Sequence, residues 1–219
     1  MQREEFLRNY WAYYLLLEEK FIHTLNYVEL AKENFGTYSN EYAALIQMIG
    51  AELDSFFKVY CASELSNHMG KRPKKLNIIG YRECIKKIYP DIAKQIVEVR
   101  SANIKFYPYK TWQVCASKNN QKPLPWWKAF TSVKHDRANN KSVACQKNAL
   151  YILGALYLLE MNYLKRNADE NRSKDIPDEE SNLFLLPDWD FRYANSNDLC
   201  LVSLENSTAI VADIPGIST

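Results

Sequence analysis

A histidine close to two fixed cations is the combination of residues in this sequence best suited to chemistry. His135 lies between Lys134 and Arg137 in the segment SVKHDR (132–137). Histidine titrates near neutral pH and can carry a proton, while the cations can stabilise charge on phosphate oxygens. We therefore predict a phosphodiester site with His135 and Arg137 as catalytic residues and Lys134 as a phosphate-binding residue. The alternative is that His135 braces the following helix while both cations face water.

Two adjacent tryptophans and a lysine precede this segment. Trp126 and Trp127 are candidates for stacking on nucleic-acid bases, and Lys128 is a candidate phosphate ligand. Aromatic residues also supply large packing surfaces, so burial of the two rings in a core is the alternative.

A second basic segment, GKRPKK, spans residues 70–75. Its glycine and proline predict a loop rather than a helix. A cluster of this kind is typical of nucleic-acid-binding patches, and it supplies four further candidate residues: Lys71, Arg72, Lys74 and Lys75. An ordinary solvated loop is the alternative.

One glutamate falls on a predicted apolar helix face. Glu52 follows Ile49 by three positions and precedes Phe56 by four, so it shares their side of a helix. A bare buried carboxylate is costly, so Glu52 must be paired, protonated or directed into a polar pocket. We interpret it either as a structural partner or as a third catalytic residue that orients His135 or Arg137.

Several kinds of chemistry lack the residues they need. The sequence has no glycine-rich nucleotide-binding motif and no G-x-S-x-G nucleophile elbow. Its histidines, His23, His68 and His135, are too scattered for a standard zinc site, and H-E-x-x-H does not occur. We therefore expect neither a metal nor a cofactor.

Apolar residues at steps of three and four predict helices along most of the chain. In the first helix, Glu18 and Glu19 fall off the apolar stripe. Ser39 is a good N-cap for the second. The expected helices cover residues 3–35, 39–66, 81–89 and 91–101, a short segment after Pro125, and 139–164, with an irregular connection over 102–123. The predicted fold is mostly α, an antiparallel helical bundle with an irregular or small β-hairpin C-terminal extension.

The composition of the chain indicates the cellular compartment in which it folds. The five cysteines include no C-x-x-C pair, which favours a reducing, cytoplasmic location over a disulfide framework. The longest apolar run, residues 149–159, is shorter than the roughly 20 residues that a bilayer-spanning helix needs, so we expect no membrane contact.

Charge is distributed unevenly despite a net charge of +2. Residues 71–87 and 121–147 are strongly basic, whereas residues 168–219 are strongly acidic. We predict a bundle domain over 1–166, then an acidic linker and C-terminal extension over 167–219 that docks on the bundle. Residues 199–204 and 209–212 are β-prone and could form the hairpin.

The order of these features resembles the HEPN superfamily of small α-helical bundles. Two long N-terminal helices, a polar segment with His135 and a closing apolar helix carry the resemblance over residues 3–165. It implies an RNA-binding protein or metal-independent endoribonuclease of a prokaryotic phage-defence or toxin system. The family motif R-x(4–6)-H is absent, so only the histidine role transfers, onto His135. The absence of this motif favours a divergent or catalytically silent member, in which Arg137 or Lys128 would take the arginine role.

Two other functions fit the charge pattern. The acidic, aromatic segment 183–213 could bind a protein partner or a second copy of the chain, making the protein a non-enzymatic interaction module or homodimer. Alternatively, the acidic extension could cover the basic segments until it is displaced, so that its removal would raise the affinity for RNA or another polyanion.

Overall fold

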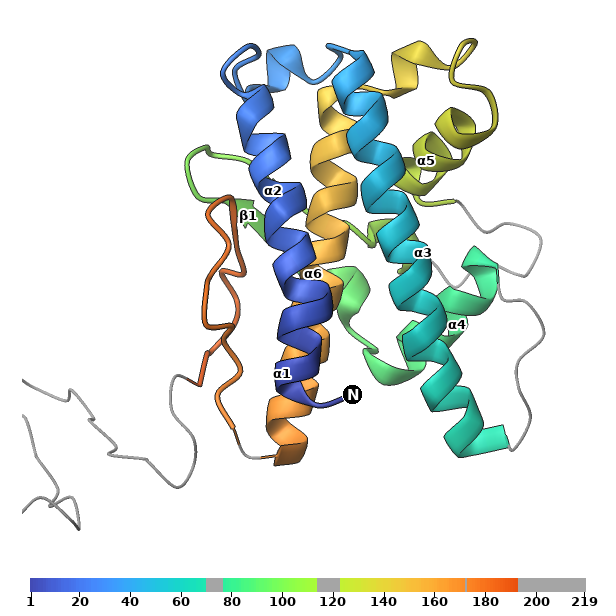
Figure 1. Cartoon of the computed structure of the whole chain (residues 1–219), viewed down its shortest axis with the longest axis vertical. Coiled ribbons are helices and arrows are strands. Elements are labelled where there is room, and N and C mark those ends of the chain that lie inside the picture. The colour runs from blue at the N-terminus through green and yellow to red at the C-terminus, as the bar shows by residue number, and fades with distance from the viewer. Residues whose placement is uncertain (70–76, 114–122, 172, 193–219) are drawn as a thin grey trace, which may run out of the picture.

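The computed structural model describes residues 1–69, 77–113, 123–171 and 173–192. Three long helical segments lie side by side and define the long axis (Figure 1). They are α1–α2, α3 (Asn40–Met69) and α6 (Gln146–Asn171). The first is continuous, because α1 (Arg3–Phe6) passes through a π-helical turn (Leu7–Trp11) into α2 (Ala12–Thr24). The prediction of a mostly α bundle is confirmed.

Buried apolar side chains explain the packing of these helices. The predicted stripe of the first helix is buried at Phe6, Tyr14, Leu17 and Phe21. Helix α6 is buried around almost its whole circumference, because α1–α2, α3 and α5 all pack against it. No helix in the described ranges has the length and apolar character to cross a membrane.

The first helix is shorter than predicted. It ends at Thr24, whose hydroxyl donates a hydrogen bond to the carbonyl of Phe21. The chain then forms turns that bond to the start of α6, where the Gln146 side chain donates to the carbonyls of Val28 and Glu29. These tertiary hydrogen bonds satisfy the carbonyls of Val28 and Glu29 without a helix, so the first helix can end at Thr24.

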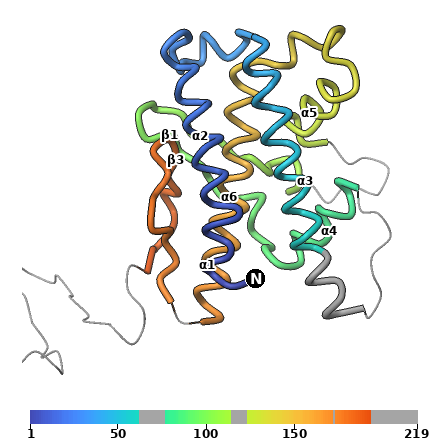
Figure 2. The backbone as a smooth tube through the Cα atoms, in the orientation of Figure 1, coloured from blue at the N-terminus to red at the C-terminus, as the bar shows by residue number. Residues whose placement is uncertain are grey.

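Two shorter helices, α4 (Ile78–Ile88) and α5 (Pro125–Asp136), pack against α3 on the side away from α1–α2 (Figures 1 and 2). The Asn77 side chain caps α4 by accepting from the backbone N–H groups of Ile79 and Gly80. Helix α5 approaches α3 closely at Gly50, where an added Cβ would lie within 3 Å of the Phe130 ring.

The helix predicted over residues 91–101 is wrong. Only a 3₁₀ turn forms, at Ile92–Lys94, and β1 (Val97–Val99) follows it. Strand β1 lies at the centre of an antiparallel sheet of order β2-β1-β3, with β2 (Lys105–Phe106) and β3 (Phe184–Leu185) as its neighbours. Val97 and Val99 are both buried on one face of the strand, which suits β-branched side chains.

The C-terminal boundaries also differ from those predicted. Helix α6 begins at residue 146 rather than 139 and continues to Asn171 rather than to residue 164. The predicted hairpin over 199–212 lies outside the described residues. The strands described are formed instead by residues before α5 and by residues 184–185.

Candidate functional site

A polar hollow lies where α3 begins and α5 ends. We call it the basic hollow and define it by Tyr38, Ser39, Asn40, Arg137, Ala138 and Lys141. Tyr38 and Ser39 lie in the connection between α2 and α3, Asn40 is the first residue of α3, and the connection between α5 and α6 supplies the others. Two cations therefore face the first residues of a 30-residue helix.

Backbone hydrogen bonds hold the two connections together. The Ser39 N–H donates to the carbonyl of Ala144 at 3.3 Å, and Tyr38 forms an isolated antiparallel bridge with Cys145. The Ser39 hydroxyl accepts from the Tyr42 N–H at 3.0 Å, which confirms the predicted N-cap of α3. These hydrogen bonds therefore fix the two connections that line the basic hollow.

The acid that ends α5 is engaged locally. Asp136 accepts hydrogen bonds from the backbone N–H and the side-chain amide of Asn139. These bonds hold the pKa of Asp136 below its ordinary value. Arg137 instead donates from Nη1 to the neutral Oδ1 of Asn40 at 3.0 Å. The guanidinium is thus positioned without being neutralised.

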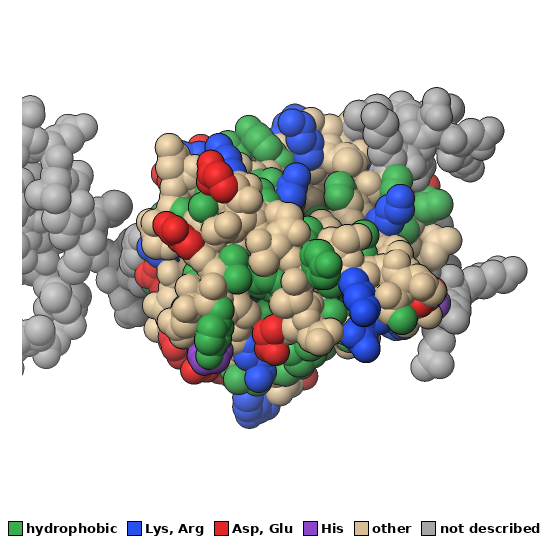
Figure 3. Space-filling view, turned by 90° about the horizontal axis from the view of Figure 1, so that it is seen from above, with side chains coloured by type: hydrophobic (Ala, Val, Ile, Leu, Met, Phe, Trp, Pro, Cys, Tyr) green, Lys and Arg blue, Asp and Glu red, His purple; other side chains and the backbone are tan. Residues whose placement is uncertain are grey.

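Cations around this end have no carboxylate partner. Within the described ranges, no ion pair involves any of the five exposed basic residues of the α5–α6 region: Lys128, Lys134, Arg137, Lys141 and Lys147. Figure 3 looks onto this end and shows Lys and Arg side chains at several separate places, some with acidic side chains between them. These five side chains therefore present separate positive charges at this end of the molecule.

His135 lies in the last turn of α5 and is exposed. Lys134, beside it, extends over the Phe130 ring with its Nζ 5.4 Å from the ring centroid. His135 and Arg137 thus share one end of the molecule, as their spacing requires. Among the described residues, no hydrogen bond to His135 holds its imidazole toward the hollow.

Glu52 does not join these two residues. It lies on α3 12 positions beyond Asn40, which places it about 18 Å farther along the helix axis than the Arg137 contact. Burial raises its pKa, and its charge in turn raises the pKa of the fully buried Glu160 on α6. The expectation that Glu52 orients His135 or Arg137 is therefore not met, because Glu52 faces another acid in the body of the bundle.

The tryptophans serve the core. Trp126 is fully buried, and its indole N–H donates to the carbonyl of Pro108 at 2.7 Å, so no base can stack on it here. Trp127 is half-buried against Phe57 and Phe130, with ring centroids 6.2 and 5.3 Å away. Lys128 is exposed, as a phosphate ligand needs to be. The candidates Lys71, Arg72, Lys74 and Lys75 lie outside the described residues.

The sequence did not single out Tyr38 or Asn40. Tyr38 is 57 % exposed and presents an aromatic surface at the hollow, a role that we had assigned to the tryptophans. Its position one residue before the predicted N-cap Ser39 was the available signal, because residues around a helix start are close to its free N–H groups.

The chain matches no family model, no curated protein and no solved structure. Its HEPN-like character therefore stays a prediction based on the order of its helices and the position of His135.

Proposed function

We propose that this chain binds single-stranded RNA at the basic hollow. The observation that supports it best is the pair of cations, Arg137 and Lys141, which face the start of α3 without a carboxylate partner in the described part of the chain. Phosphate contacts by such side chains supply most of the affinity of non-specific nucleic-acid binding.

Two other features of the hollow suit a nucleotide. The first N–H groups of an α-helix lack intrahelical acceptors and carry partial positive charge, so the start of α3 favours a phosphate. Tyr38 is exposed enough to stack on a base, a contact that single strands offer and duplexes do not. A backbone phosphate on Arg137 and Lys141 with its base on Tyr38 fits this combination.

Catalysis is a further part of the proposal. In a divergent HEPN-like ribonuclease, His135 would move a proton during attack by the ribose 2′-hydroxyl while Arg137 holds the phosphate, without a metal. Glu52 has no part in this scheme because of its distance along α3.

RNA affinity is expected to fall at least tenfold in the double variant Arg137→Gln/Lys141→Gln. Removal of two phosphate contacts lowers the slope of log affinity against log salt by about 1.4. Fluorescence anisotropy with a labelled 20-nucleotide single strand at several salt concentrations measures both quantities. The control is Lys20→Gln/Lys94→Gln, which removes the same charge at exposed positions elsewhere. Equal loss in both variants would reduce the effect to net charge and contradict a site at the hollow.

RNA cleavage in the presence of EDTA tests the catalytic part. The expected result is slow cleavage by the natural chain and at least a hundredfold loss in His135→Ala, because general acid–base groups contribute about 10²- to 10⁴-fold. The matched control is His23→Ala, an exposed histidine of α2. Equal cleavage by all three proteins would remove His135 from the mechanism while leaving the binding proposal in place.

The fold limits which residues of the segment 183–213 could bind a protein partner. Leu183, Phe184 and Leu186 are buried against the chain's own body, and β3 is paired with β1. A partner that binds within 183–213 would have to displace these residues or use residues 193–213, which lie outside the described ranges. We find no observation that favours this function over RNA binding.

A further inference from the structure

Residues 173–192, which we call the strap, return along the helical body after α6. The strap runs from the end of α6 to β1 and back again (Figures 1 and 2). Asp175 and Arg192 close it, because the Asp175 N–H donates to the Arg192 carbonyl and the Arg192 N–H donates to the Asp175 carboxylate. The strap is therefore a closed loop whose tip reaches the sheet.

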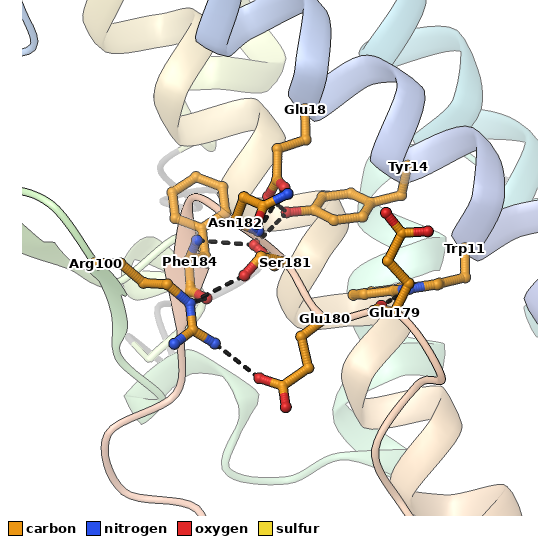
Figure 4. A network of polar contacts seen from close by, with 9 residues as sticks. All are labelled: Trp11, Tyr14, Glu18, Arg100, Glu179, Glu180, Ser181, Asn182 and Phe184. Carbon is orange, nitrogen blue, oxygen red and sulfur yellow. Dashed lines mark hydrogen bonds and ion pairs between the residues drawn. The ribbon is translucent and has the colours of Figure 1, made fainter.

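A buried polar network fixes the tip of the strap. Glu18 of α2 accepts hydrogen bonds from the hydroxyls of Tyr14 and Ser181 and from the backbone N–H of Asn182 (Figure 4). Trp11 donates its indole N–H to the Glu179 carbonyl at 2.7 Å. The network therefore attaches the tip of the strap to α1–α2.

A cavity of about 170 Å³ lies between the strap and the body. Its apolar walls come from both sides: Trp11, Tyr157 and Met161 from the body, and Ile176, Leu185 and Phe191 from the strap. An engineered apolar cavity of about 150 Å³ in another protein holds a benzene molecule. The cavity therefore has room for a ligand with one ring or a branched chain of similar size.

Two hydrogen-bond donors meet in this cavity. Tyr157 is only 3 % exposed and lines the cavity, and no hydrogen bond joins its hydroxyl to another described residue. Arg100 also lines it, and its charge opposes the effect of burial on the pKa of Tyr157, so the two groups are close. A hydroxyl at a cavity wall without a protein partner can bond to a ligand or to water.

Three hydrogen bonds hold Arg100, and none of them uses its Nη1 group. Its Nε donates to the carbonyls of Ser181 and Phe184, each at 3.0 Å, and its Nη2 donates to Glu180 at 3.0 Å. The Glu180 side chain is 55 % exposed, so it can exchange Arg100 for water at little cost. A ligand carboxylate can therefore take the place of Glu180 on the guanidinium.

We propose that this cavity binds a small organic acid with a single aromatic or branched apolar group. Its carboxylate accepts from the Arg100 guanidinium and the Tyr157 hydroxyl, and its apolar group fills the space between Met161 and Leu185. The rings do not form a cage for an organic cation, since Trp11 and Tyr157 pack on each other with centroids 6.1 Å apart.

Binding is coupled to the strap because the strap forms half of the wall. A ligand that contacts both sides stabilises the docked strap and raises the unfolding temperature of the chain as its concentration rises. This proposal is independent of RNA binding, because the basic hollow and the strap cavity share no residue.

Phenylacetate and its neutral amide, phenylacetamide, are the probes that test it. With the full chain we expect calorimetric binding of phenylacetate in the submillimolar to low millimolar range, and at least tenfold weaker binding of the amide. No detectable phenylacetate binding at 10 mM, or equal binding of acid and amide, would overturn the proposal.

Two conservative variants locate the carboxylate. Tyr157→Phe keeps the ring and removes the hydroxyl, and it is expected to weaken phenylacetate binding about fivefold to tenfold. Glu180→Gln releases Arg100 from its competitor and is expected to tighten binding at least threefold. The matched control is Glu179→Gln, which removes the same charge from the neighbouring exposed residue. Identical affinities in the Glu180 and Glu179 variants would contradict competition for Arg100, and a merely structural Glu180 would not tighten binding.

Discussion

Replacement of Glu18 by alanine is expected to lower the free energy of unfolding by about 3 to 5 kcal/mol, since three hydrogen-bond donors lose their acceptor at a buried site. Two of them, the hydroxyls of Tyr14 and Ser181, lie 3.1 Å apart and can bond to each other, which offsets part of the loss. The Asn182 N–H has no such substitute. Urea unfolding followed by circular dichroism measures the change.

The neighbouring Glu19→Ala is the matched control for this prediction. Glu19 lies on the same helix but is exposed, so its removal is expected to change stability by no more than about 0.5 kcal/mol. Glu18→Gln keeps one carbonyl acceptor but places an NH₂ group against a donor, so it should fall between the two. Equal stability of the Glu18 and Glu19 variants would show that the network does not hold the strap.

The same loss is expected to loosen the tip of the strap. Ser181 and Asn182 connect this tip to α2, while bonds from Trp11 and Arg100 and the pairing of β3 with β1 hold the neighbouring residues. Limited proteolysis should therefore cut Glu18→Ala within residues 173–192 at least tenfold faster than the natural chain, with the helical body cut later. Uniform acceleration over the whole chain would instead indicate global unfolding.

Glu18 also illustrates why part of the fold could not be predicted from the sequence. Helical periodicity predicts that Glu18 lies off the apolar stripe of the first helix. It is nevertheless only 1 % exposed, because the strap from more than 150 residues away covers it. Periodicity describes one helix at a time, so it cannot report a cover that arrives from a distant segment.

The elements that could be predicted depend on local sequence, and those that could not depend on contacts between distant residues. Helices α3 and α6 and the cap at Ser39 follow from local residue order, and the sequence predicted them. Strand β1 is predicted as a helix from the sequence, because its extended form depends on the pairing of Glu98 and Val99 with Leu185 and Phe184, a non-local contact. The cations of the basic hollow were evident as a charged segment, whereas their position opposite the start of α3 depends on the Arg137–Asn40 contact.

Stability is expected to fall as the pH rises above about 4.5, chiefly because of an acid in the middle of α6. Glu160 is fully buried, and neither of its carboxyl oxygens has a hydrogen-bond partner within the described residues. Burial first, and then the charge of Glu52, raise the pKa of Glu160 well above the ordinary 4.5 of a glutamate. The folded chain therefore keeps this proton at pH values where the unfolded chain has released it.

Proton linkage gives the direction in which the free energy of unfolding changes with pH. A raised pKa in the folded state contributes stability that is fully present below pH 4.5 and is lost as the pH rises through the folded pKa. One proton retained on folding lowers the free energy of unfolding by about 1.4 kcal/mol per pH unit in this window. The pKa of Glu52 is also raised by burial and acts in the same direction. The lowered pKa values of Asp136 and Asp178 act only at more acidic pH.

Two variants of Glu160 separate its proton from its burial. Glu160→Gln removes the titration and is expected to flatten the dependence of stability on pH between 5 and 8. Glu160→Met also removes the unsatisfied polar atoms, and it is expected to raise the free energy of unfolding at pH 8 by about 1 to 3 kcal/mol. Glu4→Gln, an exposed acid of α1, is the control and should leave the slope unchanged. A destabilised methionine variant at pH 8 would mean that the Glu160 carboxyl has a bonding partner, such as an ion or ordered water, in the middle of the bundle.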